Sequence, residues 1–353
     1  MAETQRIAVI AGDGIGPEIT EFGLRALSWA RDARGLPLEI WELPLGAEHW
    51  LREGVGLPPT LLDEIRTTCS AVLLGALGDA RIPGHEHARE ILFGLRFGLD
   101  LYANIRPVRA LSPRLIPLRG VEHIDICVFR ENTEGLYAGI GGQLRRGTAH
   151  EVAVEEDVNT RLGVERIVRA AFDFARRERR KLCLSDKSNA LRHAHDLWQR
   201  VYADVRREYP EVVCEHLYID ALCYELVRDP ARFSVIVCCN LFGDIVSDLV
   251  AGLGGGLGVA PSASVHLGSN VPVPALFEPV HGSAPQLVGK NLANPVAMLR
   301  TVGMLFDWLG RPDLGASVER AAQEAIEARE CTPDVGGTLG TTAAGEAVLR
   351  RLR

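Results

Sequence analysis

The sequence lacks the features of membrane proteins and of secreted, disulfide-bonded proteins. No stretch of its 353 residues approaches the ~20 consecutive apolar residues that a membrane helix needs. The first residues run directly into an apolar segment, without the basic region, hydrophobic segment and cleavage site of a secretory signal. The eight cysteines are scattered and form no CxxC pair, so we interpret them as reduced core residues. We therefore expect a soluble cytoplasmic protein with no membrane partner.

Basic residues are fewer than acidic ones, with 39 Lys and Arg against 46 Asp and Glu. The resulting formal net charge of -7 argues against general nucleic-acid binding. The one dense basic cluster, at 176–181, lies at the polar end of a predicted helix and is interpreted as a solvated face.

The length exceeds that of a usual single domain, and 47% of the residues are hydrophobic. These values predict two lobes and a core large enough for an enzyme.

Apolar strands alternate with amphipathic helices along much of the chain. We expect strands at 6–12, 71–77, 124–130, 181–186 and 233–240, and helices that begin after Pro17 and cover 164–176, 190–208 and 244–253. Continuous apolar strands are typical of sheets that are covered on both faces. The sequence thus predicts an α/β fold with a largely parallel sheet.

Three familiar motifs fail on inspection. GDGIG at 12–16 begins like a dinucleotide fingerprint, but Pro17 stands where the third glycine is required, so a Rossmann fold is not expected. The segment from Gly282 to Lys290 has the wrong glycine spacing for a phosphate-binding P-loop. The two His-x-His pairs, at 85–87 and 193–195, lack a third ligand at zinc-finger spacing, so zinc is not expected.

Acidic side chains form the strongest local group. NLFGDIVSDL places Asp244 and Asp248 four residues apart, on one face of a helix. Their oxygens suit Mg²⁺ or Mn²⁺, and Asp220 could supply a third ligand. An equally favoured alternative is that Asp244 only caps the helix and Asp248 only faces solvent.

A second group is suited to binding and proton transfer. Arg96, Arg106 and Arg130 flank apolar stretches, as expected of guanidinium groups that bind substrate carboxylates, although surface ion pairs are the commoner use of arginine. Tyr137 lies in RENTEGLY, and Lys187 follows a strand in SDKSNAL. Both side chains can transfer protons if their surroundings tune them.

Taken in order, these segments resemble a known family. GDGIGPEI, LLGALG, LDLYANIRPVR, RENTEGLY, DKSN, NLFGDIVSDL, GLGVAPSA and FEPVHGSAPxxxGKxxANP follow the order typical of the β-decarboxylating dehydrogenases, from residue 6 to about residue 341. That family includes isocitrate, homoisocitrate, 3-isopropylmalate and D-malate/tartrate dehydrogenases. The resemblance implies a two-domain α/β fold that is not a Rossmann fold. Residues 1–101 and 255–353 would form the cofactor-binding domain, and 102–254 the second domain with the dimer contact and the catalytic residues.

The resemblance also implies roles for the polar groups. Arg96, Arg106 and Arg130 would hold substrate carboxylates, and Asp220, Asp244 and Asp248 would hold Mg²⁺ or Mn²⁺. Lys187 would accept the proton of the 2-hydroxyl, and Tyr137 would protonate the carbon that loses CO₂. Lys187 and Asp220 would act in the site of the other subunit, so that activity requires a homodimer.

The cofactor residues are assigned in the same way. They are expected at Ile15, Glu278, His281, Gly282, Ser283, Ala284, Gln286 and Asn294. Relatives that use NAD usually carry Asp where this chain has Gln286, and relatives that use NADP tend to carry Lys and Tyr in place of Gln286 and Leu287. Because neither Lys nor Tyr is present, the resemblance favours NAD and leaves NADP open.

Substrate identity rests on the segment before Arg96. Leu92 and Phe93 predict an apolar or small pocket, whereas RENTEGLY is the version found in isocitrate, homoisocitrate and D-malate/tartrate enzymes. Arg89 and Glu90 fit none of these patterns, which raises the hypothesis of an unusual malate analogue from specialised metabolism. Strong turnover of 3-isopropylmalate beside weak turnover of every polar analogue would exclude it. A rival reading is a catalytically silent regulatory subunit.

Overall fold

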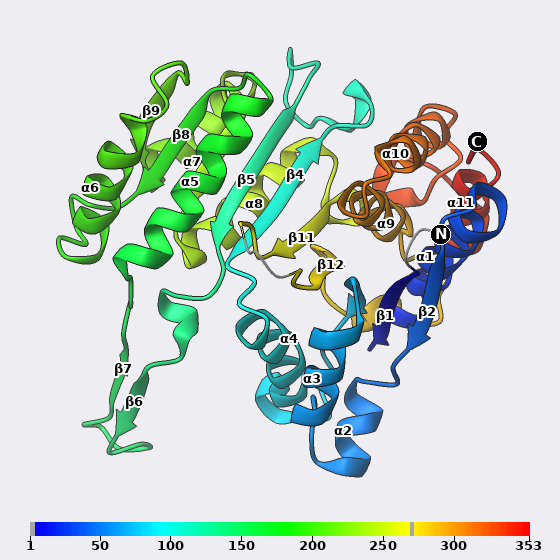
Figure 1. Cartoon of the computed structure of the whole chain (residues 1–353), viewed down its shortest axis with the longest axis horizontal. Coiled ribbons are helices and arrows are strands. Elements are labelled where there is room, and N and C mark those ends of the chain that lie inside the picture. Colours follow the sequence, from blue (N-terminus) through cyan, green and yellow to red (C-terminus); the bar gives the residue numbers. More distant parts are fainter. Residues whose placement is uncertain (1–3, 269–271) are drawn as a thin grey trace. The chain divides into compact units, whose positions relative to one another are not determined.

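The computed structural model describes residues 4–268 and 272–353. It confirms the predicted α/β fold with a largely parallel sheet. The chain divides into two compact units (Figure 1), of which the first contains the described residues of 1–101, 106–124 and 251–353. The second contains 102–105 and 125–250, so 106–124 does not belong to it, in contrast to the domain boundaries expected from the sequence.

The strands of the first unit follow the order β2-β1-β3-β12-β11. Their bounds are β1 (Gln5–Gly12), β2 (Leu38–Glu42), β3 (Ala71–Ala76), β11 (Pro261–Val265) and β12 (Ala275–Pro279). All neighbours in this order are parallel except β11 and β12. Every residue of β3 is buried, which is why its sequence AVLLGA shows no polar alternation.

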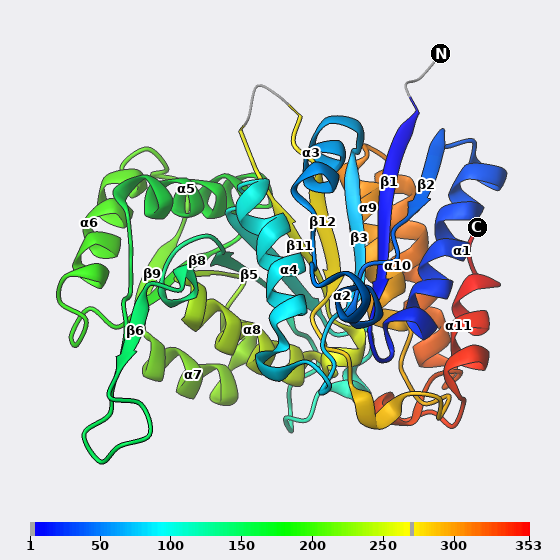
Figure 2. The same cartoon turned by 90° about the horizontal axis from the view of Figure 1, so that it is seen from below.

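Helices cover both faces of these strands (Figure 2). They are α1 (Gly16–Arg34), α2 (Ala47–Glu53), α3 (Pro59–Thr68), α4 (Glu86–Gly98), α9 (Val296–Trp308), α10 (Pro312–Glu327) and α11 (Thr341–Leu349). Helices α1 and α9 pack on one face. On the other, Ile91 and Leu95 of α4 join a core cluster with Ile10 and Leu74. Helix α4 is thereby fixed in position.

The second unit has the strand order β5-β10-β8-β9, all parallel. Its strands are β5 (Asp125–Glu131), β8 (Leu182–Asp186), β9 (Cys214–Tyr218) and β10 (Val235–Cys238), with a separate antiparallel hairpin of β6 (Gly141–Leu144) and β7 (Val152–Glu155). Its helices are α5 (Arg161–Arg177), α6 (Ala194–Arg206), α7 (Ile219–Arg228) and most of α8 (Asn240–Gly254). Strand β4 (Ala103–Arg109) has residues in both units.

Two helices begin about one turn away from their predicted starts. The helix expected at 190–208 begins only at Ala194, because a turn follows β8. The helix expected at 244–253 begins earlier, at Asn240. Asp244 therefore lies inside the first turns of α8 and does not cap it, which removes the capping alternative for this residue.

The remaining expectations from composition concern membranes and thiols. Among the described residues, no helix is both long and apolar enough to span a membrane. All eight cysteines are free. Burial raises the pKa of Cys127 and of Cys183 to about 12, so these two thiols stay protonated at neutral pH. They act as packing residues rather than nucleophiles.

Candidate active site

Three predicted site residues of the second unit form one hydrogen-bonded group. Arg130, near the end of β5, is 1% exposed and donates from Nη1 to Asp244 Oδ1 at 2.5 Å. The Tyr137 hydroxyl donates to Asp244 Oδ2 at 2.8 Å. Asn240, one turn earlier on α8, accepts from Arg130 Nε and Nη2 at 3.1 and 2.8 Å. The approach is close because Gly243 lies against Arg130, where a Cβ would meet the side chain at 2.6 Å.

This group controls the protonation of Tyr137. Burial raises the pKa of the Tyr137 hydroxyl, and its hydrogen bond to Asp244 raises it further. The nearby Arg130 guanidinium, 5.0 Å from the centre of the tyrosine ring, opposes this shift. Since the net direction is upward, Tyr137 carries its proton at neutral pH. It can act as a proton donor but not as a base there.

A second pair in the same unit joins Lys187 and Asp220. Lys187 directly follows β8, and Asp220 is the second residue of α7. Lys187 Nζ lies 2.5 Å from Asp220 Oδ1, and this hydrogen bond lowers the pKa of Asp220. The Asp220 side chain is 69% exposed, so it can contact a group outside its own chain.

The three predicted metal ligands are not gathered within one chain. Among the residues that the structure describes, no three Asp, Glu, His or Cys side chains are grouped to hold a metal ion. Asp244 and Asp248 share α8 at the predicted spacing of four residues, whereas Asp220 pairs with Lys187. The metal site formed by these three residues therefore stays a prediction.

The predicted substrate residues of the first unit lie on α4 and β4. Arg96 is 5% exposed and donates from Nη2 to Glu278 Oε1, on β12, at 2.8 Å. Glu278, which was assigned to the cofactor, thus has a structural contact that orients a predicted substrate residue. Arg106 is buried on β4, and Leu92 is half-buried on α4.

A pocket of about 300 Å³ lies in the first unit. Four of the predicted cofactor residues line it, namely Ile15, His281, Ala284 and Asn294. Glu278, Gly282, Ser283 and Gln286 are not among the lining residues. The other five lining residues had not been assigned to the cofactor, and they are Gly258, Leu287, Leu292, Pro333 and Asp334. Apolar side chains with one carboxylate and one amide suit a flat base with polar edges.

Hydrogen bonds join the segments that line this pocket. Ile15 N donates to Ser283 O at 2.9 Å, which fixes the turn after β1 against the loop at 281–284. The turn needs glycine at position 14, where φ is +60° and a Cβ would lie 2.1 Å from Ser283 O. Among the lining residues, Asn294 Nδ2 donates to Asp334 Oδ2 at 2.9 Å. Asp334 could have been suspected only from its place before a Gly-Gly pair, which is a weak signal.

Comparison with known proteins identifies the family. The family model for isocitrate/isopropylmalate dehydrogenase matches residues 6–348. A 3-isopropylmalate dehydrogenase from Thermobifida fusca is 44% identical over 99% of this chain and 98% of its own length. One from Frankia casuarinae is 45% identical over 96% and 100%.

Solved structures agree. Isocitrate dehydrogenase from Methylococcus capsulatus aligns with a TM-score of 0.89 and 37% identity, over 99% of this chain and all of that one. A β-decarboxylating dehydrogenase from Thermococcus kodakarensis aligns with a TM-score of 0.79 and 33% identity, over 99% and 96%. With the fold, the family model, the similar sequences and the solved structures in agreement, the chain belongs to the isocitrate/isopropylmalate dehydrogenase family and is a β-decarboxylating dehydrogenase that acts on a CH-OH donor.

Proposed function

We propose that this enzyme oxidises and decarboxylates a (2R)-2-hydroxy acid of the 3-isopropylmalate type, with NAD and a divalent metal ion. The observation that carries the proposal is the group formed by Arg130, Tyr137 and Asp244, in which a guanidinium and a protonated phenol meet at one carboxylate. Binding a substrate carboxylate beside a proton donor is what decarboxylation followed by protonation needs.

The metal would be held by Asp244 and Asp248 of one subunit and Asp220 of the other. The fit is chemical, because α8 offers two carboxylates four residues apart and hard oxygen ligands suit Mg²⁺ or Mn²⁺. When bound, such an ion supplies Lewis-acid stabilisation of negative charge on a substrate oxygen. Asp244 would then exchange its present contact with Arg130 for this role.

The chain's own residues account for binding and for the protons. Arg96, Arg106 and Arg130 would bind the substrate carboxylates through charge-assisted hydrogen bonds. Lys187 would accept the proton of the 2-hydroxyl as the hydride leaves C2. The β-carboxylate then leaves as CO₂ with its bonding electrons remaining on C3, and Tyr137 would return a proton to that carbon.

NAD would bind in the pocket next to the turn after β1 and supply the hydride acceptor. Ile15, His281, Ala284, Asn294 and Asp334 would surround its adenosine part. Gly282, Ser283 and Gln286 would contribute from the same loop. Gln286 is exposed and uncharged, so it would neither repel the 2′-phosphate of NADP nor bind it strongly. The proposal of NAD over NADP therefore rests on the absence of the Lys and Tyr that relatives using NADP tend to carry at this position and the next.

The proposed 3-substituent is apolar. The similar proteins from Thermobifida fusca and Frankia casuarinae carry the name 3-isopropylmalate dehydrogenase, and Leu92 and Phe93 are half-buried on α4. Neither name points to D-malate, tartrate or homoisocitrate. Glu90 Oε2 accepts a hydrogen bond from Gly56 N at 2.6 Å, and the Arg89 guanidinium lies 5.8 Å from the Phe93 ring centre. Because both residues have partners in the chain, they give the unusual-analogue hypothesis no structural support.

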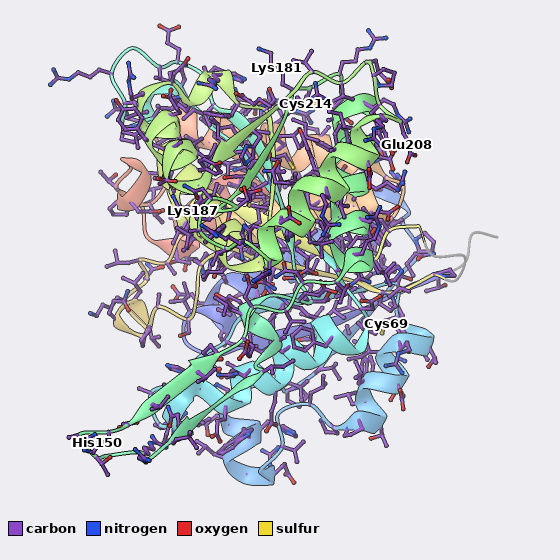
Figure 3. The ribbon with its side chains drawn as sticks, turned by 90° about the vertical axis from the view of Figure 1, so that its left-hand side faces the viewer. Cys69, His150, Lys181, Lys187, Glu208 and Cys214 are labelled. Carbon is purple, nitrogen blue, oxygen red and sulfur yellow. The ribbon has the colours of Figure 1, made fainter. Side chains whose placement is uncertain are left out.

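We further propose a homodimer in which Lys187 and Asp220 act in the partner's site. The hairpin of β6 and β7 extends from the second unit, with His150 near its tip (Figure 3), and all its strand residues are exposed. Leu144 and Ile140 are 67% and 52% exposed there. Exposed apolar side chains on an unpaired two-stranded hairpin favour pairing with another chain.

The test is reduction of NAD⁺ and NADP⁺ with Mn²⁺ present, against 3-isopropylmalate, D-malate, tartrate, isocitrate and homoisocitrate in parallel. We expect 3-isopropylmalate with NAD⁺ to be the best pair, with CO₂ released in equal amount. Preference for a polar substrate would refute the proposed 3-substituent. Silence with all five would instead favour the regulatory-subunit alternative.

A further inference from the structure

The segment that follows β8 contains a contact that no proposed step uses. His195, in the first turn of α6, is 1% exposed. Its Nδ1 lies 2.8 Å from the backbone nitrogen of Lys187, which donates to it. Ala190 N and Leu191 N in turn donate to Lys187 O at 2.9 and 2.8 Å. Both backbone polar groups of Lys187 are therefore held by the turn that His195 closes.

The hydrogen bond defines the state of the imidazole ring. An Nδ1 that accepts from an amide carries no proton, so the proton of the neutral ring is on Nε2. Burial lowers the pKa of His195, although the carboxylates of Asp186 and Asp157 oppose the shift, and the neutral form is therefore favoured. Nε2 lies 3.8 Å from Asp157 Oδ2 and has no hydrogen-bond partner among the described residues.

The same ring also contacts the helix of the predicted metal ligands. It meets the ring of Phe242 edge to face, with centroids 5.3 Å apart. Phe242 is the third residue of α8, two positions before Asp244. His195 thus connects the backbone of one predicted catalytic residue to the helix that carries another.

We propose that His195 is a positioning residue for Lys187, fixing its main chain at the end of β8 and setting it relative to α8. The inference rests on the proposed role of Lys187 as proton acceptor. Lysine reaches its reacting atom through a flexible four-carbon chain, so its position depends on how firmly the backbone is held. Displacement of a reacting group by about 1 Å can cost roughly 100-fold in rate.

A neighbouring anchor makes the effect of His195 separable. Asp186 is buried and accepts from Ser188 N at 2.9 Å, from Gln199 Nε2 at 2.6 Å and from His216 Nε2 at 3.0 Å. The bonds from Gln199 and His216 hold the end of β8 to α6 and β9 without His195, and the bond from Ser188 lies within the turn after β8. We therefore expect His195 variants to fold, with the disturbance confined to Lys187.

The experiment compares two substitutions in the full-length protein. His195→Asn keeps an acceptor oxygen at the Nδ1 position, whereas His195→Phe keeps a ring against Phe242 but removes the acceptor. We expect kcat to fall about tenfold to 100-fold in His195→Phe, with KM little changed, and to recover to within a few fold in His195→Asn. His193, which is exposed two residues earlier, gives the matched controls His193→Asn and His193→Phe.

A second readout does not depend on turnover. The chain has three lysines, at positions 181, 187 and 290, and the first two lie at opposite ends of β8 (Figure 3). Limited amine acylation followed by mass spectrometry reports the reactivity of Lys187 against Lys181 and Lys290 as internal references. We expect a changed ratio in His195→Phe and a wild-type ratio in His195→Asn. If His195→Phe does not fold, His195→Leu replaces it.

The outcomes separate this inference from the proposed function. Absence of turnover in the wild-type enzyme would refute the proposed function, while the labelling ratio would still decide the role of His195. Unchanged kcat and unchanged Lys187 reactivity in His195→Phe would overturn the inference. So would equal losses in His195→Asn and His195→Phe, because rescue by an acceptor is its central claim.

Discussion

At the scale of single residues, Tyr137 carries the most direct prediction. Tyr137→Phe keeps the ring near Arg130 but removes the hydroxyl that donates to Asp244. We expect the rate of product formation to fall about 100-fold or more, as general-acid groups typically contribute. Parallel assays of NADH and of CO₂ measure it, and Tyr224→Phe, at an exposed position on α7, is the control. Wild-type rates of both products in Tyr137→Phe would contradict the role.

The pKa of Tyr137 also predicts a pH dependence. Since burial and Asp244 raise this pKa, the proton is present throughout neutral pH and is lost only as the pH rises above the ordinary range for tyrosine. We therefore expect that deprotonation of Tyr137 causes no loss of activity between pH 7 and pH 9. A tyrosine with a lowered pKa would lose its proton, and the enzyme its activity, within this range. A pH profile of kcat in wild type and Tyr224→Phe tests this expectation.

His87 shows how a single buried residue ties segments together. Asp13 Oδ2 accepts from Gly78 N and lies 2.8 Å from His87 Nε2, and Asp13 Oδ1 accepts from Ala47 N at 2.6 Å. His87→Leu leaves the carboxylate with fewer partners, so we expect the free energy of unfolding to fall by about 1–3 kcal/mol. Urea denaturation measures the change. His87→Gln should recover part of it, and His85→Leu, at an exposed position, should cost little.

The residue scale also shows what sequence reasoning could not reach. The placement of Asp244 and Asp248 on one helix was predictable because four-residue spacing on a helix is a local property. The contacts of His87 and His195 could not be predicted, since the sequence showed only two His-x-His pairs. Both pairs were interpreted as surface or helix residues. Their roles depend on partners 74 and 8 positions away. Burial of one histidine in each pair is a tertiary effect that no local pattern contains.

At the scale of elements, the turn between β1 and α1 is the most sensitive to substitution. Gly14→Ala would place a Cβ 2.1 Å from Ser283 O at a φ of +60°. We expect it to raise the KM for NAD strongly and to destabilise the first unit. Gly35→Ala, at the end of α1, has a similar φ of +65° but nothing within 4 Å, so it should cost only about 1 kcal/mol. Equal effects of the two variants would contradict the proposed close approach.

Elements were predicted best where one period dominates. Helices α1 and α5 could be predicted from their apolar stripes, and strand β3 from its continuous apolar run. The start of α6 was missed because its pattern extends through the turn that His195 closes. The pocket wall formed by Pro333 and Asp334 was missed because this loop has no periodicity, and it faces Asn294 only through tertiary contacts.

At the scale of the whole molecule, the proposed sharing of residues between subunits predicts complementation. Lys187→Ala and Asp244→Asn should each abolish activity as homodimers. In a mixed dimer, one site would combine the intact Asp244 of the first variant with the intact Lys187 of the second. The other site would carry both substitutions. Unfolding and refolding the two variants together should therefore restore activity. Because one of its two sites is intact, each mixed dimer should reach up to about half the activity of a wild-type dimer.

A site built from the residues of a single chain makes the opposite prediction, so the experiment distinguishes the two arrangements. If Lys187 and Asp244 of the same chain served one site, every site in the mixture would lack one of the two, and activity would stay absent. Mixing Lys187→Ala with Asp220→Asn is the matched control, because both residues are proposed to be lent together. Each site of such a mixed dimer would then miss one lent residue. Restoration in the first mixture alone would establish that each active site is shared between two subunits.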